Sequence, residues 1–342
     1  MTLAAQFLAL PLARRALAFE QAAAQSSMPA VIIEKDFWVS WLLGQLFAAP
    51  SLAPHLVFKG GTSLSKVFGV MDRFSEDIDL SLAPEFVGAD TAVFDAQGSR
   101  TQRDGAMKEM QRLCAETVRE RVQPTLEAAL FSALGTPEAG GWLRFELDAE
   151  AQSPILYFRY PATQSAGFDY LRREVKLELG ALTDQQPTGR HAVRPLLADA
   201  FPTLFTDWSC EVTALSLART FWEKATILHA EFYRPATSAT PDRYARHYFD
   251  LAKLLGHSEA PQFLADRALC QRVVEWKRCF FSRAWASYDL ARHGSFRLVP
   301  PPERQAALEK DYTTMEPMFI TTPPPFAALM AKLSDAEVVL NG

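Results

Sequence analysis

The sequence predicts an α/β (α+β) protein in which a lobe built on a small mixed sheet is followed by a helical lobe. Short strand-forming stretches recur between residues 55 and 181, separated by glycines, turns and one charged helical pattern. From residue 215 onward, apolar residues recur at helical spacing instead. With 342 residues, 49% of them apolar, the chain is long enough to form two lobes with a large core.

Residues 1–50 are expected to form an N-terminal helical segment. After Pro29, four apolar residues share one helical face: Phe37, Trp41, Leu42 and Leu46. The opening MTLAAQFLALPLARRALAF lacks the basic start of a leader peptide, and Arg14 and Arg15 interrupt its apolar run. No stretch approaches about 18 uninterrupted apolar residues, so no membrane span is expected.

The catalytic core is expected within residues 51–205. Five strands are predicted, at 55–58, 77–82, 142–149, 155–162 and 174–181. Gly60 and Gly61 end the first strand, and SLSKVF after them predicts the first turns of a helix. Residues 100–133 are charged and periodic, which indicates a helical insertion.

Residues 206–342 are expected to form the helical C-terminal lobe, with its strongest helices at 215–233, 242–255 and 269–289. The four cysteines (Cys114, Cys210, Cys270 and Cys279) form no C-x-x-C pair, which indicates reduced thiols in a cytoplasmic protein rather than a zinc site. The formal net charge of -5 does not favour nucleic acid, so any such contact must come from a local basic patch.

Two carboxylates stand on the second predicted strand. Alternate strand residues share a face, so Asp77 and Asp79 project together while Ile78 faces the core. Two carboxylates this close repel unless a cation lies between them, and an oxygen-ligated Mg²⁺ meets that need. A D-x-D by itself is also typical of a solvated strand face and of glycosyltransferases.

The upstream glycines make the pattern more specific. Gly60 and Gly61 let the backbone approach a ligand, and the helix start offers free N–H groups to phosphate. Thr62, Ser63 and Lys66 would add hydroxyl and ammonium donors, although a plain turn is the alternative. On the last predicted strand, Glu178 is the candidate third acid with Lys176 on its face; an exposed Lys–Glu pair is the alternative.

Gly-Gly followed by an acid-apolar-acid strand and a later strand carboxylate resembles the DNA polymerase β-like nucleotidyltransferase superfamily. The fuller text FKGGTSLSKVF…RFSEDIDLSL resembles the AbiEii/AbiGii toxin nucleotidyltransferases of type IV toxin–antitoxin pairs, to which the MenT toxins are related. The resemblance continues in EKDFWVSWLL, EKATILH, RHYFDL and GSFRLVP, and so covers most of the chain. One departure is that the stretch from Gly61 to Asp77 is longer than usual in the superfamily.

The resemblance implies a polymerase β-like lobe and transfer of a nucleoside monophosphate from an NTP to an acceptor hydroxyl. It implies Mg²⁺ held by Asp77, Asp79 and Glu178, with tRNA 3′ ends as an acceptor class among relatives. It also implies growth inhibition and a cognate AbiEi-like antitoxin encoded alongside. The rival acceptors are a protein side chain (AMPylation) and a small molecule, and the non-enzymatic rival is a module that only binds NTP or RNA.

Basic residues of the helical lobe complete the predicted site. Lys224 falls on the apolar stripe of its helix, where a lysine either extends to the surface or points into a polar site, and the resemblance favours a role in binding the triphosphate. The resemblance also places Arg246 at the nucleotide, oriented by Asp250 four residues on. Two further residues are predicted to bind the acceptor: Lys277, expected on the apolar stripe of helix 269–289, and the solvent-facing Arg278.

Overall fold

The structure is a computed structural model, and it describes residues 3–26, 28–91, 99–137, 139–164, 172–203, 205, 208–281 and 283–342. The chain forms two compact units: unit 1 comprises Met1–Val67 and Glu76–Ala214, and unit 2 comprises Phe68–Ser75 and Leu215–Gly342. The chain therefore leaves unit 1 after Val67 and returns at Glu76. The predicted domain boundaries at residues 50 and 205 stay predictions, and residue 206 lies outside the described residues.

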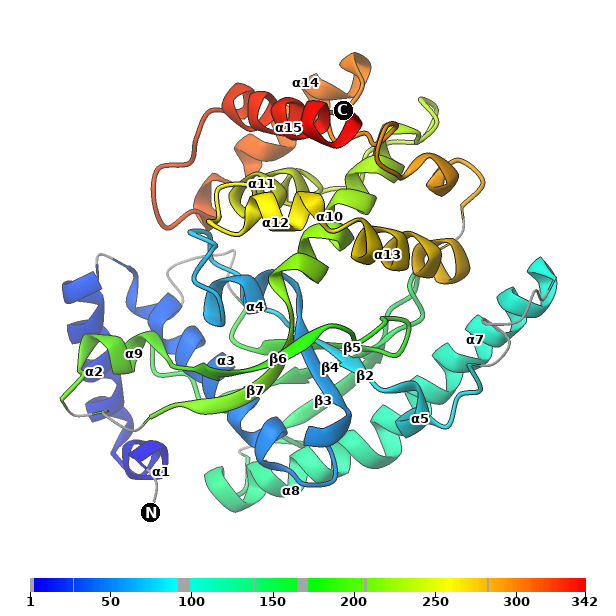
Figure 1. Ribbon diagram of the computed structural model, residues 1–342. Helices are drawn as coiled ribbons and strands as arrows, with labels where there is room; N and C mark the ends of the chain where they lie inside the picture. Colours follow the sequence, from blue (N-terminus) through cyan, green and yellow to red (C-terminus); the bar gives the residue numbers. More distant parts are fainter. Residues whose placement is uncertain are drawn as a thin grey trace. The chain divides into compact units, whose positions relative to one another are not determined.

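Unit 1 is built on a mixed sheet, which within the described residues has seven strands in the order β3-β4-β5-β2-β1-β7-β6 (Figure 1). All five predicted strands are present: β1 (Leu56–Lys59), β2 (Ile78–Leu82), β3 (Leu143–Leu147), β4 (Pro154–Phe158) and β5 (Val175–Gly180). The sequence pattern missed β6 (Thr188–Val193) and β7 (Cys210–Leu215). Strand β6 is an edge strand of this sheet, and Val193 is its only buried residue. It therefore lacks the alternation of buried and exposed residues that marks a half-buried strand.

Strand β2 lies at the centre of this sheet. It runs antiparallel to β1 and parallel to β5, and its residues Ile78, Leu80 and Leu82 are fully buried. Burial alternates along β5 as predicted, whereas β3 begins buried and becomes exposed at its far end. The acids of β2 and β5 are therefore carried by neighbouring strands with apolar residues anchored beneath them.

The helices of unit 1 are spread along its sequence, before and between its strands. They are α1 (Leu3–Leu8), α2 (Leu12–Ser26), α3 (Ala30–Ala48), the short η1 (Ala53–His55), α4 (Gly60–Lys66), α5 (Pro84–Val87), α7 (Arg100–Thr117), the π-helical η2 (Val118–Val122), α8 (Gln123–Leu134) and α9 (Leu196–Ala200). The α7–α8 segment confirms the predicted helical insertion. Helix α3 packs against β5, α8 and α9, and its predicted apolar face is buried.

Unit 2 is helical, as predicted. Its elements are α10 (Leu217–Phe232), α11 (Ala245–Leu254), α12 (Ala260–Ala265), α13 (Arg267–Phe280), η3 (Tyr288–Leu290), α14 (Pro302–Thr314), η4 (Glu316–Met318) and α15 (Phe326–Asn341). Helix α10 packs against α11, α12 and α13. None of the helices in the described ranges is long and apolar enough to cross a membrane.

The predicted helix over 269–289 is wrong in its second half. Helix α13 ends at Phe280, and turns follow it. Ser287 adopts a positive φ of 48°, which an α-helix cannot accommodate. The apolar pattern therefore continues in the sequence beyond the point where the helix stops.

Segment 68–75 belongs to unit 2 although its flanking residues belong to unit 1. Arg73 forms a β-bridge with Phe319, and the N–H of Phe74 donates to the Met318 carbonyl at 2.7 Å. The N–H of Ile320 donates to the Asp72 carbonyl at 2.9 Å. The extra length between Gly61 and Asp77 is therefore used for an excursion into unit 2.

Candidate active site

Two of the predicted acids face each other across neighbouring parallel strands. Asp79 of β2 and Glu178 of β5 are paired in register. Asp77 immediately precedes β2 and, two residues before Asp79, projects to the same face because strand side chains alternate. The structure therefore gathers the three carboxylates at one place on the sheet of unit 1.

The electrostatics of this place favour a cation. Burial raises the pKa of Asp77 to about 6, and the negative charges of Glu76, Asp79 and Glu178 add to the rise against the opposing charge of Lys176. The Asp77 carboxyl is thus crowded by acids and short of positive charge. A bound cation would favour its ionised form.

Glu178 is bound to its neighbour. Lys176 donates a hydrogen bond to the Glu178 carboxylate, and both side chains are partly exposed. Across the described ranges, no group of three or more His, Cys, Asp or Glu side chains is positioned to hold a metal ion. Metal binding by Asp77, Asp79 and Glu178 therefore stays a prediction, and Glu178 is bound by Lys176 in this structure.

Gly60 is required by the position of Asp79. Its φ is +81°, and a Cβ built on it would lie 2.0 Å from Oδ2 of Asp79. Only glycine lets the chain turn from β1 into α4 so close to that carboxylate. Helix α4 begins at Gly60 itself, a few residues earlier than the sequence predicted.

The predicted phosphate donors that follow the glycines are engaged within unit 1. Thr62 Oγ1 donates to the Asp77 carbonyl, and Ser63 Oγ donates to the Gly60 carbonyl at 2.9 Å. Lys66 Nζ forms an ion pair with Asp36 at 2.6 Å, and both side chains are buried. These contacts tie α4 to the segment that carries Asp77, and they show a structural use for three residues assigned to the nucleotide.

In unit 2, Asp250 is the centre of a buried charge cluster. Its carboxylate accepts from Arg73 Nε at 2.7 Å, from Arg73 Nη2 at 2.8 Å and from Lys224 Nζ at 2.7 Å. Although burial opposes it, the charges of Arg73 and Lys224 hold the pKa of Asp250 well below its usual range. Sequence reasoning missed Arg73, since its partner lies 177 residues away and leaves no local pattern.

Arg246 does not form the expected contact with Asp250. Its Nε is buried and has no hydrogen-bond partner in the described part of the chain. His247, 3.3 Å from Lys224, is neutral because burial and then the charge of Lys224 hold its pKa well below 6.5. This cluster therefore joins the cations Arg73 and Lys224 to Asp250, and Arg246 lies on the same helix α11.

The two acceptor-binding residues predicted on α13 lie on the sides of the helix expected for them. Arg278 is exposed, as predicted, and forms an ion pair with Asp289 at 2.9 Å. Lys277 follows the buried Val273 by four residues and precedes the buried Phe280 by three, so it shares their side of α13 as predicted. Its side chain is half-buried, with Nζ 4.4 Å from the centre of the Phe281 ring, and its role toward an acceptor stays a prediction.

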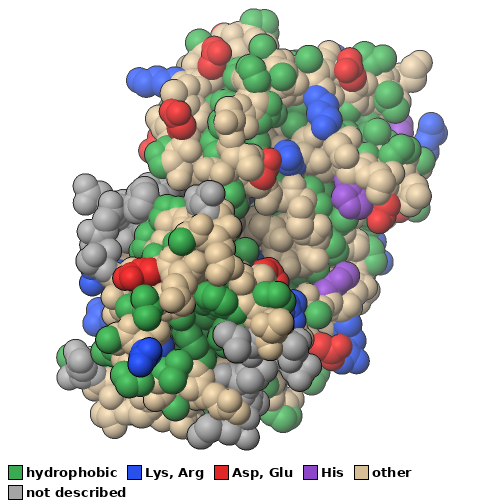
Figure 2. All heavy atoms as spheres, turned by 90° about the vertical axis from the view of Figure 1, so that its left-hand side faces the viewer, with side chains coloured by type: hydrophobic (Ala, Val, Ile, Leu, Met, Phe, Trp, Pro, Cys, Tyr) green, Lys and Arg blue, Asp and Glu red, His purple; other side chains and the backbone are tan. Residues whose placement is uncertain are grey.

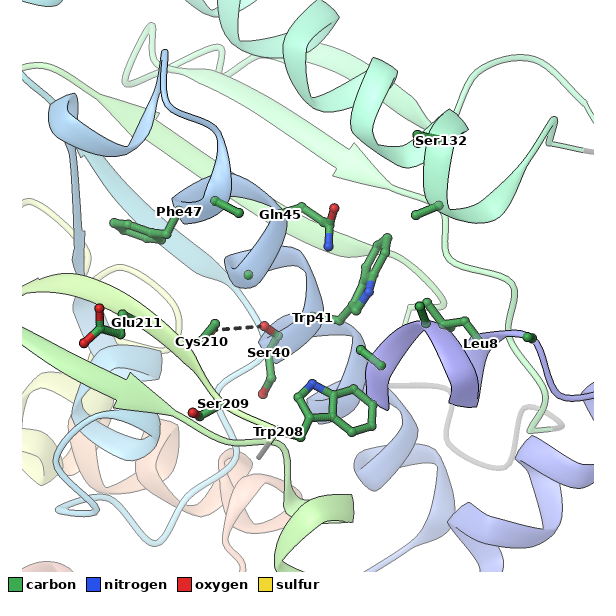
Figure 3. A pocket seen from close by; sticks show the side chains of 16 residues that line it. Leu8, Ser40, Trp41, Gln45, Phe47, Ser132, Trp208, Ser209, Cys210 and Glu211 are labelled. Atoms are coloured by element: carbon green, nitrogen blue, oxygen red, sulfur yellow. Dashed lines mark hydrogen bonds between the residues drawn. The ribbon is translucent and has the colours of Figure 1, made fainter. Parts of the chain in front are cut away.

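A separate cavity of about 850 Å³ in unit 1 lies among α1, α3, α8 and β7 (Figure 3). Trp41 and Trp208 line it, and Cys210 Sγ contacts the Ser40 carbonyl at 3.6 Å. Burial raises the pKa of Cys210 to about 11, so the thiol is protonated and a poor nucleophile. None of the predicted site residues lines this cavity, so it is not the candidate active site.

The surface charge is mixed. On the face in Figure 2, the described Lys and Arg side chains stand singly or in small groups among acidic and hydrophobic ones. This agrees with the net charge of -5. Binding of a polyanion to such a face would depend on local groups of cations.

Comparison with known proteins relates the chain to one family. The family model described as nucleotidyl transferase AbiEii toxin, type IV TA system, matches residues 41–333. Among solved structures, the chain is similar to MenT4, a nucleotidyltransferase toxin from Mycobacterium tuberculosis H37Rv, with 17% identity and a TM-score of 0.43 over 97% of this chain and 100% of that chain. Curated proteins give no significant match. The family match includes every predicted site residue.

Proposed function

The chain belongs to the AbiEii family of nucleotidyltransferase toxins, and from that premise we propose that it transfers a nucleoside monophosphate from an NTP to an acceptor hydroxyl at Asp77 and Asp79. The acceptor oxygen would bond to the α-phosphorus, the bond between the α-phosphorus and the bridging oxygen would break, and pyrophosphate would leave. The observation that carries this proposal is the close approach of Gly60 to Asp79, since it ties the glycine turn to the acid strand.

Mg²⁺ is part of the proposal. Mg²⁺ in nucleotide sites is commonly held by one or two carboxylates, with waters and substrate phosphates completing its octahedron. Asp77 and Asp79 fit that donor set, and the crowding that raises the pKa of Asp77 to about 6 is what a bound cation would relieve. When bound, the ion would supply charge neutralisation to the phosphates.

Glu178 and Lys176 have a proposed role beside these acids. Glu178 is 41% exposed and reaches solvent, so an acceptor hydroxyl can approach it. Once Lys176 turns to a phosphate, the Glu178 carboxylate would be able to take the proton of the acceptor hydroxyl. Gly60 and Gly61 would supply backbone close to the nucleotide, as the family resemblance implies.

The charge cluster of unit 2 is proposed to bind triphosphate. Arg73 and Lys224 bind Asp250, and Arg246 lies on the same helix α11, while His247 adds no positive charge because its pKa is held well below 6.5. Phosphoryl transfer relies mainly on positioning and on neutralising charge, and such buried cations serve both. The buried Nε of Arg246 is a donor that a phosphate oxygen would satisfy.

The acceptor is proposed to be RNA, with a tRNA 3′ end as the leading candidate. What supports this is the exposed Arg278 beside other basic residues of α13, together with the family resemblance. Growth inhibition in the cytoplasm and neutralisation by an AbiEi-like antitoxin belong to the same proposal.

The test is a labelling experiment with a matched pair of variants. Wild type, Asp79→Asn and Asp335→Asn are incubated with each α-labelled NTP, Mg²⁺ and total RNA plus cell lysate protein. Asp335 is exposed on α15 and serves as the matched Asp-to-Asn control. Wild type and Asp335→Asn should label RNA, and folded Asp79→Asn should not. Label in protein would instead favour AMPylation, and equal labelling by all three would overturn the assignment of the acids.

A further inference from the structure

We propose that Lys35 and Asp36 are positioning residues that clamp the two ends of the excursion 68–75 and thereby hold Asp77 in place. The inference rests on the proposed function, since the position of Asp77 matters only if that group reacts with a nucleotide. Both residues precede the part of the chain that the family model matches. Lys35 and Asp36 and the residues that they bind all lie in unit 1.

Helix α3 carries three consecutive buried charges, an unusual arrangement for a helix in a core. Glu34, Lys35 and Asp36 are only 1%, 2% and 5% exposed. Neighbouring residues point about 100° apart around a helix, so the three side chains reach three different segments. Glu34 binds the backbone N–H groups of Thr163 and Gln164 at 2.7 and 2.9 Å.

Lys35 and Asp36 reach the two ends of the excursion. Asp36 binds Lys66 at 2.6 Å, one residue before the chain leaves unit 1. Lys35 binds Glu76, the first residue after its return. One turn of one helix therefore fixes both the departure and the return of the chain.

Each clamp residue also holds a second segment. Lys35 Nζ donates to the carbonyl of Arg172 at 2.9 Å, close to the start of β5. Asp36 Oδ2 accepts from the N–H of Leu196 at 2.6 Å, where α9 begins. Through Glu76 and Arg172, Lys35 therefore ties together the approaches to β2 and β5, the two strands of the active-site acids.

The order of the charges specifies the pairing. If the two ends of segment 68–75 exchanged their places on α3, Lys35 would face Lys66 and Asp36 would face Glu76. Like charges that are buried side by side are strongly unfavourable. Buried ion pairs contribute little net stability but strongly disfavour arrangements in which a charge loses its partner. The two ion pairs therefore fix which residues of the chain meet α3. A shift of the chain by one residue at Glu76 would displace Asp77, which follows it directly.

The test separates this role from simple charge neutralisation. The variants are Lys35→Met, Lys35→Arg, Asp36→Asn, Glu76→Gln and the double variant Lys35→Met/Glu76→Gln. Glu34→Gln is the matched control, because it removes an equally buried charge from the same turn but holds a different loop. The measurements are hydrogen–deuterium exchange, melting temperature, and kcat and KM for the labelled NTP.

Lys35→Met should raise exchange in residues 76–82 and Asp36→Asn should raise it in residues 60–66, whereas Glu34→Gln should raise it in neither segment. Lys35→Met should lower kcat about tenfold to a hundredfold, the scale for displaced reacting groups, with KM changed by less than about threefold. Lys35→Arg should restore most of kcat. The double variant leaves neither charge without its partner, so it should melt above both Lys35→Met and Glu76→Gln and still show low kcat.

A double variant with wild-type kcat would overturn the proposal, since Lys35 would then only neutralise Glu76. Unchanged exchange in both segments would overturn it as well. If Lys35→Met does not fold, the comparison of the double variant with Glu76→Gln decides the question. Absence of transfer by the wild type would instead refute the proposed function, and the exchange pattern would still decide whether the clamp exists.

Discussion

Replacing Asp250 with Asn should destabilise unit 2 more than removing either of its cationic partners. The substitution keeps the shape of the side chain and removes one negative charge. In the folded protein that charge is completely buried and bound by both Arg73 and Lys224. The variant therefore removes the negative charge that these two buried cations share.

The magnitude follows from the number of partners lost. Removing one member of a buried ion pair costs about 3–5 kcal/mol, because the other charge stays buried without a partner. Asp250→Asn takes the carboxylate away from two buried cations at once, so we expect the upper part of that range, about 4–5 kcal/mol. Lys224→Met leaves Asp250 with both bonds from Arg73, so its cost should be close to that of one charged hydrogen bond, about 1.5–3 kcal/mol. Since whole domains are stable by only about 5–15 kcal/mol, this difference is large.

The assay is equilibrium unfolding in urea, read through hydrogen exchange of α11 so that unit 2 is followed separately. Asp335→Asn is the control for loss of a surface carboxylate. The expected order of destabilisation is Asp250→Asn, then Lys224→Met, then Asp335→Asn with almost no effect. If Asp250→Asn were no less stable than Lys224→Met, the carboxylate would not be neutralising two buried cations, and the argument would fail.

Three further outcomes are expected. Burial holds the pKa of His229 at about 4, below its usual 6.5, so the free energy of unfolding should fall by about 3 kcal/mol as the pH drops from 6.5 to 4. In urea titrations at several pH values, the free energy of unfolding of His229→Asn should depend less steeply on pH. Arg278→Glu should weaken RNA binding and reduce the salt slope by about one unit or less per lost phosphate contact; identical slopes in filter binding would exclude α13. Gly60→Ala should lower transfer at least about tenfold by displacing Asp79, whereas Gly69→Ala, with a φ of +61° and open space around it, should not.

The local parts of the site could be predicted from sequence because their signals are local. Strand alternation alone places Asp77 and Asp79 on one face, and a glycine pair after a strand marks a close turn. The apolar spacing of α10 likewise places Lys224 on the apolar stripe and leaves open whether it extends to the surface, and the structure shows it buried. Each inference needs only a few neighbouring residues.

Tertiary structure decided which partner each charged side chain meets. Lys66 was predicted to face phosphate, yet it binds Asp36, 30 residues away. Glu76 binds Lys35 across 41 residues, and Arg73 binds Asp250 across 177. No periodicity or spacing in the sequence indicates ion pairs between residues so far apart, because these pairs depend on how whole helices and strands pack.

The sequence by itself therefore determined the fold class, the acid strand, the glycine turn and the family. Only the tertiary structure decided that α13 stops at Phe280, that segment 68–75 belongs to unit 2, and that α3 holds both ends of that segment. The physical reason is the range of the forces involved. Backbone conformation and amphipathic periodicity act over one or two turns, whereas buried ion pairs are selected by the packing that removes them from water.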